Sequence, residues 1–548
     1  MHIWACQRNS AGAPLGQSLT SPSGNLRAKC LVLDLEYFWQ NEVEVSYRSF
    51  CRKYSGGPGA GPRLAVRASR GQAKGTDVVI SRMAEGLTRR VDGLASGLSE
   101  TFLEPVIRLG VTGLARSGKT VFITSLVANL LERGRMPGVL AAHEGRISAA
   151  FLQPQPDDTV PRFDYEAHLA ALSAPVPSWP ESTRTVSQLR LSLRVRPSGL
   201  LGGLQGPRVV HVDIVDYPGE WLLDLALLDK SYAEWATEAL RRLKSRQEAA
   251  PYIAQAQEAE AQAAFEEPAA QALAQGYVAC LRSVREAGYY RCTPGRFLLP
   301  GELAGSPVLT FAPLPRPEAP SRRSLWREME RRFEAYKARV VKPFFRDHFA
   351  RIDRQVVLID ALGAIHQGPQ AVEDMRGAMA DTLGAFRPGR NAFLTRLLMG
   401  RRVERILFAA TKADHLHHTQ HGRLQAIMAA LTHEARARAD FAGAETRSMA
   451  IAALRATTEE TIEHHGRPLD CVRGTLLENG RQAAFYPGEL PDDPMRLLAP
   501  AREGAEAWLD ADYKVMSFAP SRLELRPGNG PPHIRLDHAL QFLIGDRL

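Results

Sequence analysis

The chain lacks any uninterrupted apolar run of the roughly 18 residues that a membrane-spanning helix requires, although 45% of its 548 residues are hydrophobic. Its six cysteines are scattered and include no C-x-x-C pair, so no disulfide framework is indicated. A G-x-S-x-G motif is missing, and His433-Glu434 has no second histidine at the spacing of a zinc peptidase. These absences favour a cytoplasmic protein whose membrane association, if any, is peripheral or through a partner.

Net charge is scarce outside the first 82 residues. Residues 1–82 carry eleven Lys and Arg against five acidic residues, so six of the nine net positive charges lie there. The remaining three charges are too few to indicate a nucleic acid partner. This leader also lacks the apolar core of a signal peptide. We expect an artefact of start-site choice or a disordered tail rather than a folded module.

A phosphate-binding pattern is present at residues 106–120. The sequence Val-Ile-Arg-Leu-Gly-Val-Thr-Gly-Leu-Ala-Arg-Ser-Gly-Lys-Thr is an apolar run that ends in G-x-x-x-x-G-K-S/T. The two glycines permit a tight turn whose N–H groups face a polyphosphate, while Lys119 adds positive charge and Thr120 a hydroxyl ligand for Mg²⁺. Apolar residues then recur at helical spacing up to Gly134. The predicted phosphate-binding residues are Gly113, Leu114, Ala115, Arg116, Ser117, Gly118, Lys119, Thr120 and Val121.

A second motif follows another β-rich run. Residues 209–215 lead into Asp216-Tyr-Pro-Gly219, which has the form D-x-x-G. At the carboxyl edge of a sheet, Asp216 would hold Mg²⁺ through water, and Gly219 would offer its N–H to a γ-phosphate.

A third apolar run begins at Arg405 and ends in Thr411-Lys412-Ala413-Asp414, which has the form T-K-x-D. The carboxylate of Asp414 is suited to accept both the ring N–H and the exocyclic amine of guanine, whereas adenine offers no matching donor, and Lys412 would pack along the base. Each motif alone is weak evidence, but the order of the three motifs, each after an apolar strand, indicates a guanine nucleotide.

Two details weaken this guanine prediction. The loop after the last predicted strand, Ser448 to Leu454, contains Ala452 where a GTPase usually has serine, so only the backbone of Ala453 and Leu454 would contact the guanine oxygen. Thr411 replaces a more frequent asparagine, although its hydroxyl is expected to tie the strand to the phosphate-binding loop.

On these segments, together with Val357-Leu-Ile-Asp-Ala-Leu362 and the stretch from His533 to Leu548, the chain resembles the P-loop GTPases. More narrowly, it resembles the YcjX-like family of bacterial stress-associated proteins, from about Met83 to the end. The resemblance implies a cytosolic protein that binds GTP or GDP, with a helical insertion and an inner-membrane protein partner in envelope stress responses. It implies no settled effector.

The expected fold is a doubly wound, mostly parallel α/β sheet of the P-loop GTPase kind with a large helical insertion. Residues 221–350 are rich in helix formers, and their start at Trp221 is interpreted as a core face rather than a membrane stripe. The predicted divisions are a leader at 1–82, a nucleotide-binding domain at 83–220 and 351–460, the helical insertion at 221–350, and a C-terminal extension at 461–548. Residues 138–180 are expected to be irregular. In the extension, loops are expected after Thr461, followed by a short amphipathic helix from Leu536 to Leu543.

The candidate catalytic residues are Lys119, Glu220 and Arg116. Glu220 stands where a glutamine or histidine often orients the attacking water, so slow turnover is expected unless its pKa is raised enough to make it a base. Arg116 would either reach the phosphates in cis or, as we favour, form a surface ion pair. Thr183 and Thr185 are both candidates for a switch threonine on Mg²⁺, against the alternative of an ordinary loop threonine.

The histidines at 415, 417, 418 and 421 are expected on a solvated face rather than at a metal site. Three functions remain open. The leading one is a slow Mg²⁺-dependent GTPase switch in an envelope or general stress response that acts through a partner. The alternatives are an ATP-using enzyme and a scaffold that nucleotide stabilises and whose hydrolysis is vestigial.

Overall fold

The computed structural model describes residues 104–114, 116–181, 185–198, 206–384, 403–509, 513–524 and 526–548. The predicted leader at residues 1–82 lies outside these ranges. The predicted domain boundaries stay predictions.

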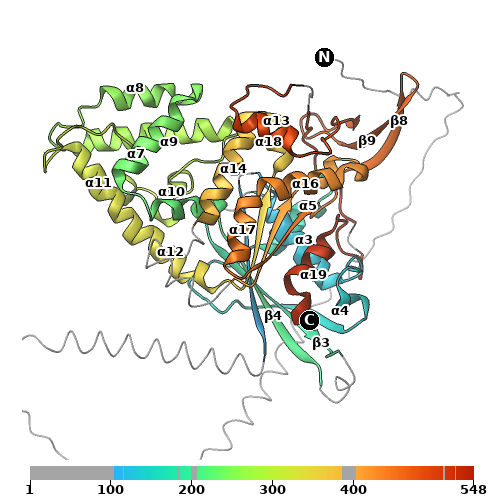
Figure 1. Ribbon diagram of the computed structural model, residues 1–548. Coiled ribbons are helices and arrows are strands. Elements are labelled where there is room, and N and C mark those ends of the chain that lie inside the picture. The colour runs from blue at the N-terminus through green and yellow to red at the C-terminus, as the bar shows by residue number, and fades with distance from the viewer. Residues whose placement is uncertain are drawn as a thin grey trace, which may run out of the picture. The chain divides into compact units, whose positions relative to one another are not determined.

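A seven-stranded sheet with the order β2-β3-β4-β1-β5-β6-β7 forms the centre of the described chain (Figure 1). Neighbouring strands from β4 to β7 run parallel, while β3 pairs antiparallel with both β2 and β4. The strands are β1 (Val106–Gly113), β2 (Ile147–Gln153), β3 (Ser187–Val195), β4 (Arg208–Asp216), β5 (Arg354–Ile359), β6 (Arg405–Ala410) and β7 (Glu445–Ala450). The predicted α/β fold with a mostly parallel sheet is confirmed.

The sheet is buried on both faces because alternate side chains of its strands enter two different cores. On β5, Val357 and Ile359 belong to one core, whereas Val356 and Leu358 belong to the other. Helices α3 (Lys119–Glu132) and α19 (Leu536–Ile544) cover the second core, on the opposite side of the sheet from α14 and α17 in Figure 1. The first core is covered by α13 (Ala361–Gln367), α14 (Pro369–Gly384), α16 (His421–Leu431) and α17 (His433–Phe441).

Between β4 and β5 the chain is helical and contributes to the first core. Its main helices are α6 (Gly219–Leu222), α7 (Tyr232–Lys244), α8 (Ala250–Glu258), α9 (Glu267–Glu286), α10 (Gly295–Leu298), α11 (Leu325–Tyr336) and α12 (Lys342–Asp347). Their centre is aromatic: Trp235 of α7 stacks on Phe333 of α11 with ring centroids 4.9 Å apart. Trp221 is 2% exposed, which confirms the predicted core face at the start of this segment.

The C-terminal part differs from expectation. Loops were predicted after Thr461, but β8 (Thr458–His464), β9 (Arg467–Thr475) and β10 (Gln482–Phe485) form a small antiparallel sheet, followed by α18 (Met495–Arg502). Residues of β8 are mostly exposed, so the strand has no alternation of apolar and polar residues from which it could be predicted. The predicted C-terminal helix is confirmed as α19, whose Leu543 carbonyl accepts a hydrogen bond from buried Arg354 at 2.9 Å.

Two boundaries nearer the sheet also differ. Residues 138–180 were expected to be irregular, yet they contain β2 together with α4 (Leu140–His143) and α5 (Tyr165–Ser173). Strand β7 ends at Ala450 rather than Leu454, because the N–H and carbonyl of Ala452 pair with Ile534 instead of continuing the sheet. In the described ranges, every helix is too short or too polar to cross a membrane.

Candidate nucleotide-binding site

The phosphate-binding loop lies where β1 meets α3. Arg116 and Gly118 both have positive φ angles, of 63° and 76°, and the Ser117 N–H donates to the Leu114 carbonyl at 3.1 Å. A Cβ on Gly113 would lie 2.1 Å from Ser117 Oγ and 3.1 Å from the Leu358 carbonyl oxygen, so a larger residue there would displace the loop or the neighbouring strand. Ala115, one of the predicted loop residues, lies outside the described residues.

The D-x-x-G motif packs directly against this loop. In the parallel pairing of β1 with β4, Asp216 stands opposite Val111, just before the loop begins. A Cβ on Gly219 would lie 2.3 Å from the Gly113 carbonyl oxygen. The two glycines thus allow the backbones of the two motifs to touch, which brings Asp216 beside Lys119.

Lys119 and Asp216 form a buried ion pair. The Lys119 Nζ and Asp216 Oδ1 atoms are 2.7 Å apart, and the side chains are 10% and 1% exposed. Within the described part of the chain, neither the ammonium nor either carboxylate oxygen makes a well-aligned hydrogen bond. Buried charges with unused hydrogen-bonding capacity are costly. A polyphosphate beside Lys119 and a cation beside Asp216 would satisfy both, so the residues present fit a magnesium nucleotide.

Thr120, the predicted direct Mg²⁺ ligand, begins the helix beside this ion pair. Its hydroxyl donates to the Glu181 carbonyl at 3.3 Å. Glu181 borders residues 182–184, so the predicted switch candidate Thr183 lies outside the described residues. The other candidate, Thr185, is described but does not line the cavity at the loop.

Glu220 is joined to the segment between β4 and β5. Arg285 of α9 donates to Glu220 Oε1 at 2.8 Å, and Glu220 is 7% exposed. Both side chains line the same cavity as the phosphate-binding loop. The carboxylate that was predicted to face the attacking water is therefore held by an arginine from a helix 65 residues away in the chain.

The T-K-x-D motif lies at the end of β6, partly in the short 3₁₀ helix η9 (Ala413–His415). Asp414 is 4% exposed, and its Oδ2 accepts the Ala456 N–H at 2.8 Å. Among the described residues, no donor is found for its Oδ1, which can therefore accept from a ligand. Lys412 has a positive φ of 61° and forms an ion pair with Asp360 at the end of β5.

One expectation for this motif is wrong. The Thr411 hydroxyl was expected to tie the strand to the phosphate-binding loop, but it donates to the Ile359 carbonyl of β5 at 3.3 Å. In the parallel pairing of β5 with β6, Ile359 stands opposite Ala410, so the Ile359 carbonyl lies within reach of the adjacent Thr411 hydroxyl.

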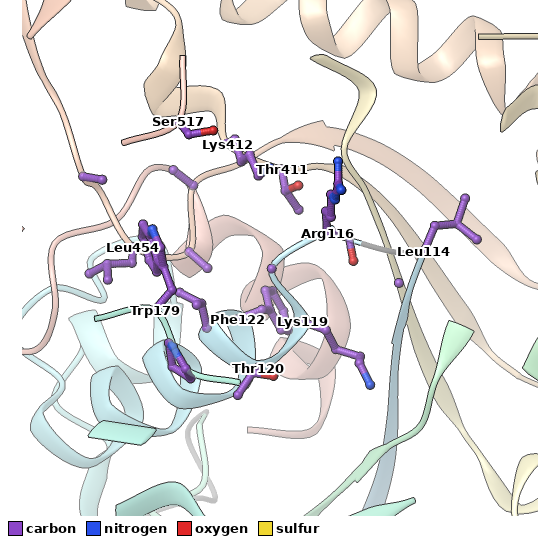
Figure 2. A pocket seen from close by; sticks show the side chains of 18 of the residues that line it. Leu114, Arg116, Lys119, Thr120, Phe122, Trp179, Thr411, Lys412, Leu454 and Ser517 are labelled. Atoms are coloured by element: carbon purple, nitrogen blue, oxygen red, sulfur yellow. The ribbon is translucent and has the colours of Figure 1, made fainter. Parts of the chain in front are cut away.

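One cavity of about 430 Å³ joins the two motifs, within the range of roughly 300–1,000 Å³ that is typical of ligand pockets. Figure 2 shows Trp179 and Leu454 together on one side of the loop and Arg116 on the other. Of the predicted residues, the cavity is lined by Gly113, Leu114, Arg116, Ser117, Gly118, Lys119, Thr120, Val121, Glu220, Thr411, Lys412, Asp414, Ala453 and Leu454. Asp216 and Gly219 lie behind the loop, where they contact Lys119 and Gly113.

The sequence did not predict the aromatic wall beside Asp414. Trp179 donates its indole N–H to the Phe518 carbonyl at 2.8 Å, and the His415 ring meets the Phe518 ring edge-on at 5.2 Å. Burial lowers the pKa of His415, so its ring is neutral at neutral pH. The histidines at 415, 417, 418 and 421 were expected on a solvated face. That prediction is wrong for three of them, since only His418 is exposed. Nothing in the local sequence pattern marks Trp179 or Phe518, because each meets the motif only through the fold.

Known proteins are similar to this chain over most of its length. The family model described as the YcjX-like family matches residues 107–548. A protein of Shewanella oneidensis named Ras-like GTPase YcjX is 37% identical over 468 residues, which cover 81% of this chain and 94% of that protein. A protein of the same name from Escherichia coli K12 is 36% identical over 456 residues, which cover 81% and 96%. The chain therefore belongs to the YcjX-like family.

Proposed function

We propose that this protein binds GTP and GDP in the cavity between Lys119 and Asp414 and hydrolyses GTP slowly as a molecular switch. The observation that carries the proposal is the buried Asp414 carboxylate, which lines the same cavity as the phosphate-binding loop and keeps Oδ1 available as an acceptor. The name Ras-like GTPase of the two relatives agrees with this reading.

Guanine selection follows from the chemistry of the carboxylate. An ionised carboxylate only accepts hydrogen bonds, and guanine presents two donors side by side on its ring N–H and exocyclic amine. Adenine presents a ring acceptor in place of the N–H donor, which a carboxylate would repel. Because the Ala456 N–H fixes Oδ2, the orientation of Asp414 is set before the base arrives.

At the phosphate end, Lys119 and the loop N–H groups bind the β- and γ-phosphates, and the Gly219 N–H reaches the γ-phosphate. Thr120 and Asp216 would hold Mg²⁺, with Thr183 or Thr185 as a further ligand. When bound, Mg²⁺ neutralises charge that develops on the transferred phosphoryl oxygens. Lys119 then exchanges its ion pair with Asp216 for phosphate contacts.

Slow hydrolysis follows from the position of Glu220. A carboxylate accepts hydrogen bonds but donates none, and it repels the triphosphate; its ion pair with Arg285 offsets part of that repulsion. Arg285 places positive charge near the γ-phosphate end, whereas Arg116 lines the cavity at the rim of the loop. Since Arg285 lies on α9, nucleotide state and the helical segment are linked at this ion pair.

The helical segment between β4 and β5 would bind a partner with an affinity that depends on whether GTP or GDP is bound. We extend the proposal to a cytoplasmic protein that acts in a stress response with an inner-membrane protein, as the family resemblance implies. The ion pair between Arg285 and Glu220 supports the part of this proposal that links the insertion to the nucleotide.

The test is to identify the nucleotide that leaves the purified full-length protein on denaturation, and then to follow GTP and ATP turnover over hours. GDP or GTP in the released fraction, with GTP turnover of about 10⁻⁴ to 10⁻² s⁻¹, supports the proposal. ATP consumption faster than about 1 s⁻¹ would identify an ATP-using enzyme instead. Tight guanine nucleotide without turnover would identify the scaffold alternative.

A further inference from the structure

A second polar cluster lies next to the guanine-reading motif and has no part in the proposed function. It consists of His417 and His418, at the start of the 3₁₀ helix η10 (His418–Gln420), and Glu459 of β8. One ligand atom from each of the three residues lies within 4.8 Å of the others. His418 Nδ1 is 2.7 Å and His417 Nε2 is 3.7 Å from the same oxygen, Glu459 Oε2.

The surroundings of His417 favour a metal rather than an ordinary ion pair. Its Nδ1 lies 3.0 Å from Thr419 Oγ1 and 3.4 Å from Asp470 Oδ2, and Asp470 in turn accepts from Thr461. A proton on Nδ1 is therefore well supported, which leaves the Nε2 lone pair facing the Glu459 carboxylate. A metal-binding histidine characteristically donates its other N–H to a carboxylate in this way.

The donor set identifies the metal class. Two imidazole nitrogens and one carboxylate oxygen suit zinc, whereas Mg²⁺ and Ca²⁺ prefer oxygen ligands alone. Ligand atoms around a tetrahedral zinc are about 3.3 Å apart, so side-chain shifts of about 1 Å would close the site. Arg455 lies 3.4 Å from Glu459 Oε1, which holds the second carboxylate oxygen away and leaves Oε2 as the ligand. The fourth position would take water.

We infer that His417, His418 and Glu459 form a zinc site that fastens the guanine-reading loop to β8. The two segments are already joined on the other side of this site, because Asp414 accepts the Ala456 N–H and its carbonyl accepts the Thr457 hydroxyl. A zinc ion would be held by His417, three residues after Asp414, and by Glu459, two residues after Thr457. It would therefore connect the same two segments a second time. Because binding free energies are reciprocal, zinc tightens guanine nucleotide binding and nucleotide tightens zinc binding. This coupling step rests on the proposed function.

Zinc binding is tested on full-length protein without an affinity tag, stripped of metal and nucleotide and titrated with ZnCl₂ by calorimetry. The wild type binds one zinc ion per chain. Glu459→Gln, which keeps the size of the side chain, and His417→Ala each weaken zinc binding at least about tenfold. The double variant His464→Ala/His465→Ala removes an exposed histidine pair on the same small sheet and is the control with unchanged affinity.

Absence of zinc binding in the wild type, or equal binding by Glu459→Gln and the wild type, overturns the inference. Because nucleotide is absent from this titration, its result is independent of guanine selectivity. The coupling is read from the release rate of fluorescent GDP, which zinc slows at least about threefold in the wild type and leaves unchanged in Glu459→Gln. Equal release with and without zinc in the wild type overturns the coupling.

Discussion

The two ends of the nucleotide cavity are built in different ways. At the phosphate end, one short loop supplies most of the residues that line the cavity, and its turn depends on Gly113 and Gly118. At the base end, Trp179, Asp414, Leu454 and Phe518 come from four segments that only the fold brings together. The phosphate end is therefore a local property of the sequence, whereas the base end depends on how α5, β6, β7 and the C-terminal part pack. Changes at the two ends should have different consequences.

The largest effect is expected from Lys119→Ala. In the proposed complex the Lys119 ammonium leaves Asp216 for the β- and γ-phosphates, and loss of one partner of a buried charge pair costs about 2–5 kcal/mol. Isothermal titration should show GTP affinity roughly 100- to 1,000-fold lower. Arg116→Gln in the same loop is the control and should change affinity less than about threefold, because its side chain lies at the rim. Equal losses in the two variants would contradict the central role of Lys119.

Arg285→Ala should lower GTP turnover about tenfold, because Glu220 would then stand unpaired near the triphosphate and positive charge would be missing at that end. GDP affinity should change less than about twofold, since GDP lacks the γ-phosphate. Single-turnover hydrolysis and GDP titration separate the two effects. Arg282→Ala on the exposed face of the same helix is the matched control. Turnover that rises in Arg285→Ala would show that this arginine restrains hydrolysis instead.

Trp179→Ala removes the aromatic side of the base end. A ring that packs on a base contributes about 1–3 kcal/mol, so GDP and GTP affinity should both fall about tenfold. Trp508→Ala is the control, because Trp508 also donates its indole N–H to a backbone carbonyl, of Ile365, but does not line the cavity. A loss confined to GTP would contradict the assignment of Trp179 to the base end.

The smallest effect concerns pH. Burial lowers the pKa of His415 in the folded state, so below about pH 6.5 the unfolded chain binds a proton that the folded chain does not. The free energy of unfolding should therefore fall as the pH drops from 7.5 to 5.5. His415→Phe keeps a ring against Phe518 but has no proton to gain. In urea unfolding, its free energy of unfolding should therefore fall by about 1 kcal/mol less than that of the wild type over this pH range. An identical pH profile in the variant would show that His415 gains its proton without cost.

The sequence predicted the parts of the fold that follow regular patterns. Strands β1, β4 and β6 are apolar runs, and each is followed by one motif at its carboxyl end. The apolar residues of α19 recur at helical spacing. Strand β8 could not be predicted, because Glu, Thr and His along Thr458–His464 show no buried face. Strand β2 is a sheet edge whose pairing with β3 depends on contacts about 40 residues apart in the chain.

The same distinction applies to the site. Lys119 and Asp414, which line one cavity, could be predicted as site residues because each lies in a motif whose spacing reflects a backbone turn. Arg285 and Phe518 were not identified, because each reaches the cavity from a segment whose local sequence is ordinary. The histidines after Asp414 were expected to be solvated, and the burial of His417 depends on β8 and β9, which the sequence did not predict.

The most direct test of the account is nucleotide selectivity in the wild type and in Asp414→Asn, measured by titration with GTP, ATP and xanthosine triphosphate. The wild type should prefer GTP to ATP by a large factor. Asp414→Asn should bind GTP roughly ten- to a thousandfold more weakly, since a buried mismatch costs about 1–3 kcal/mol per group, and should gain affinity for xanthosine triphosphate. Equal affinity of the wild type for ATP and GTP, or unchanged preference in Asp414→Asn, would contradict the account.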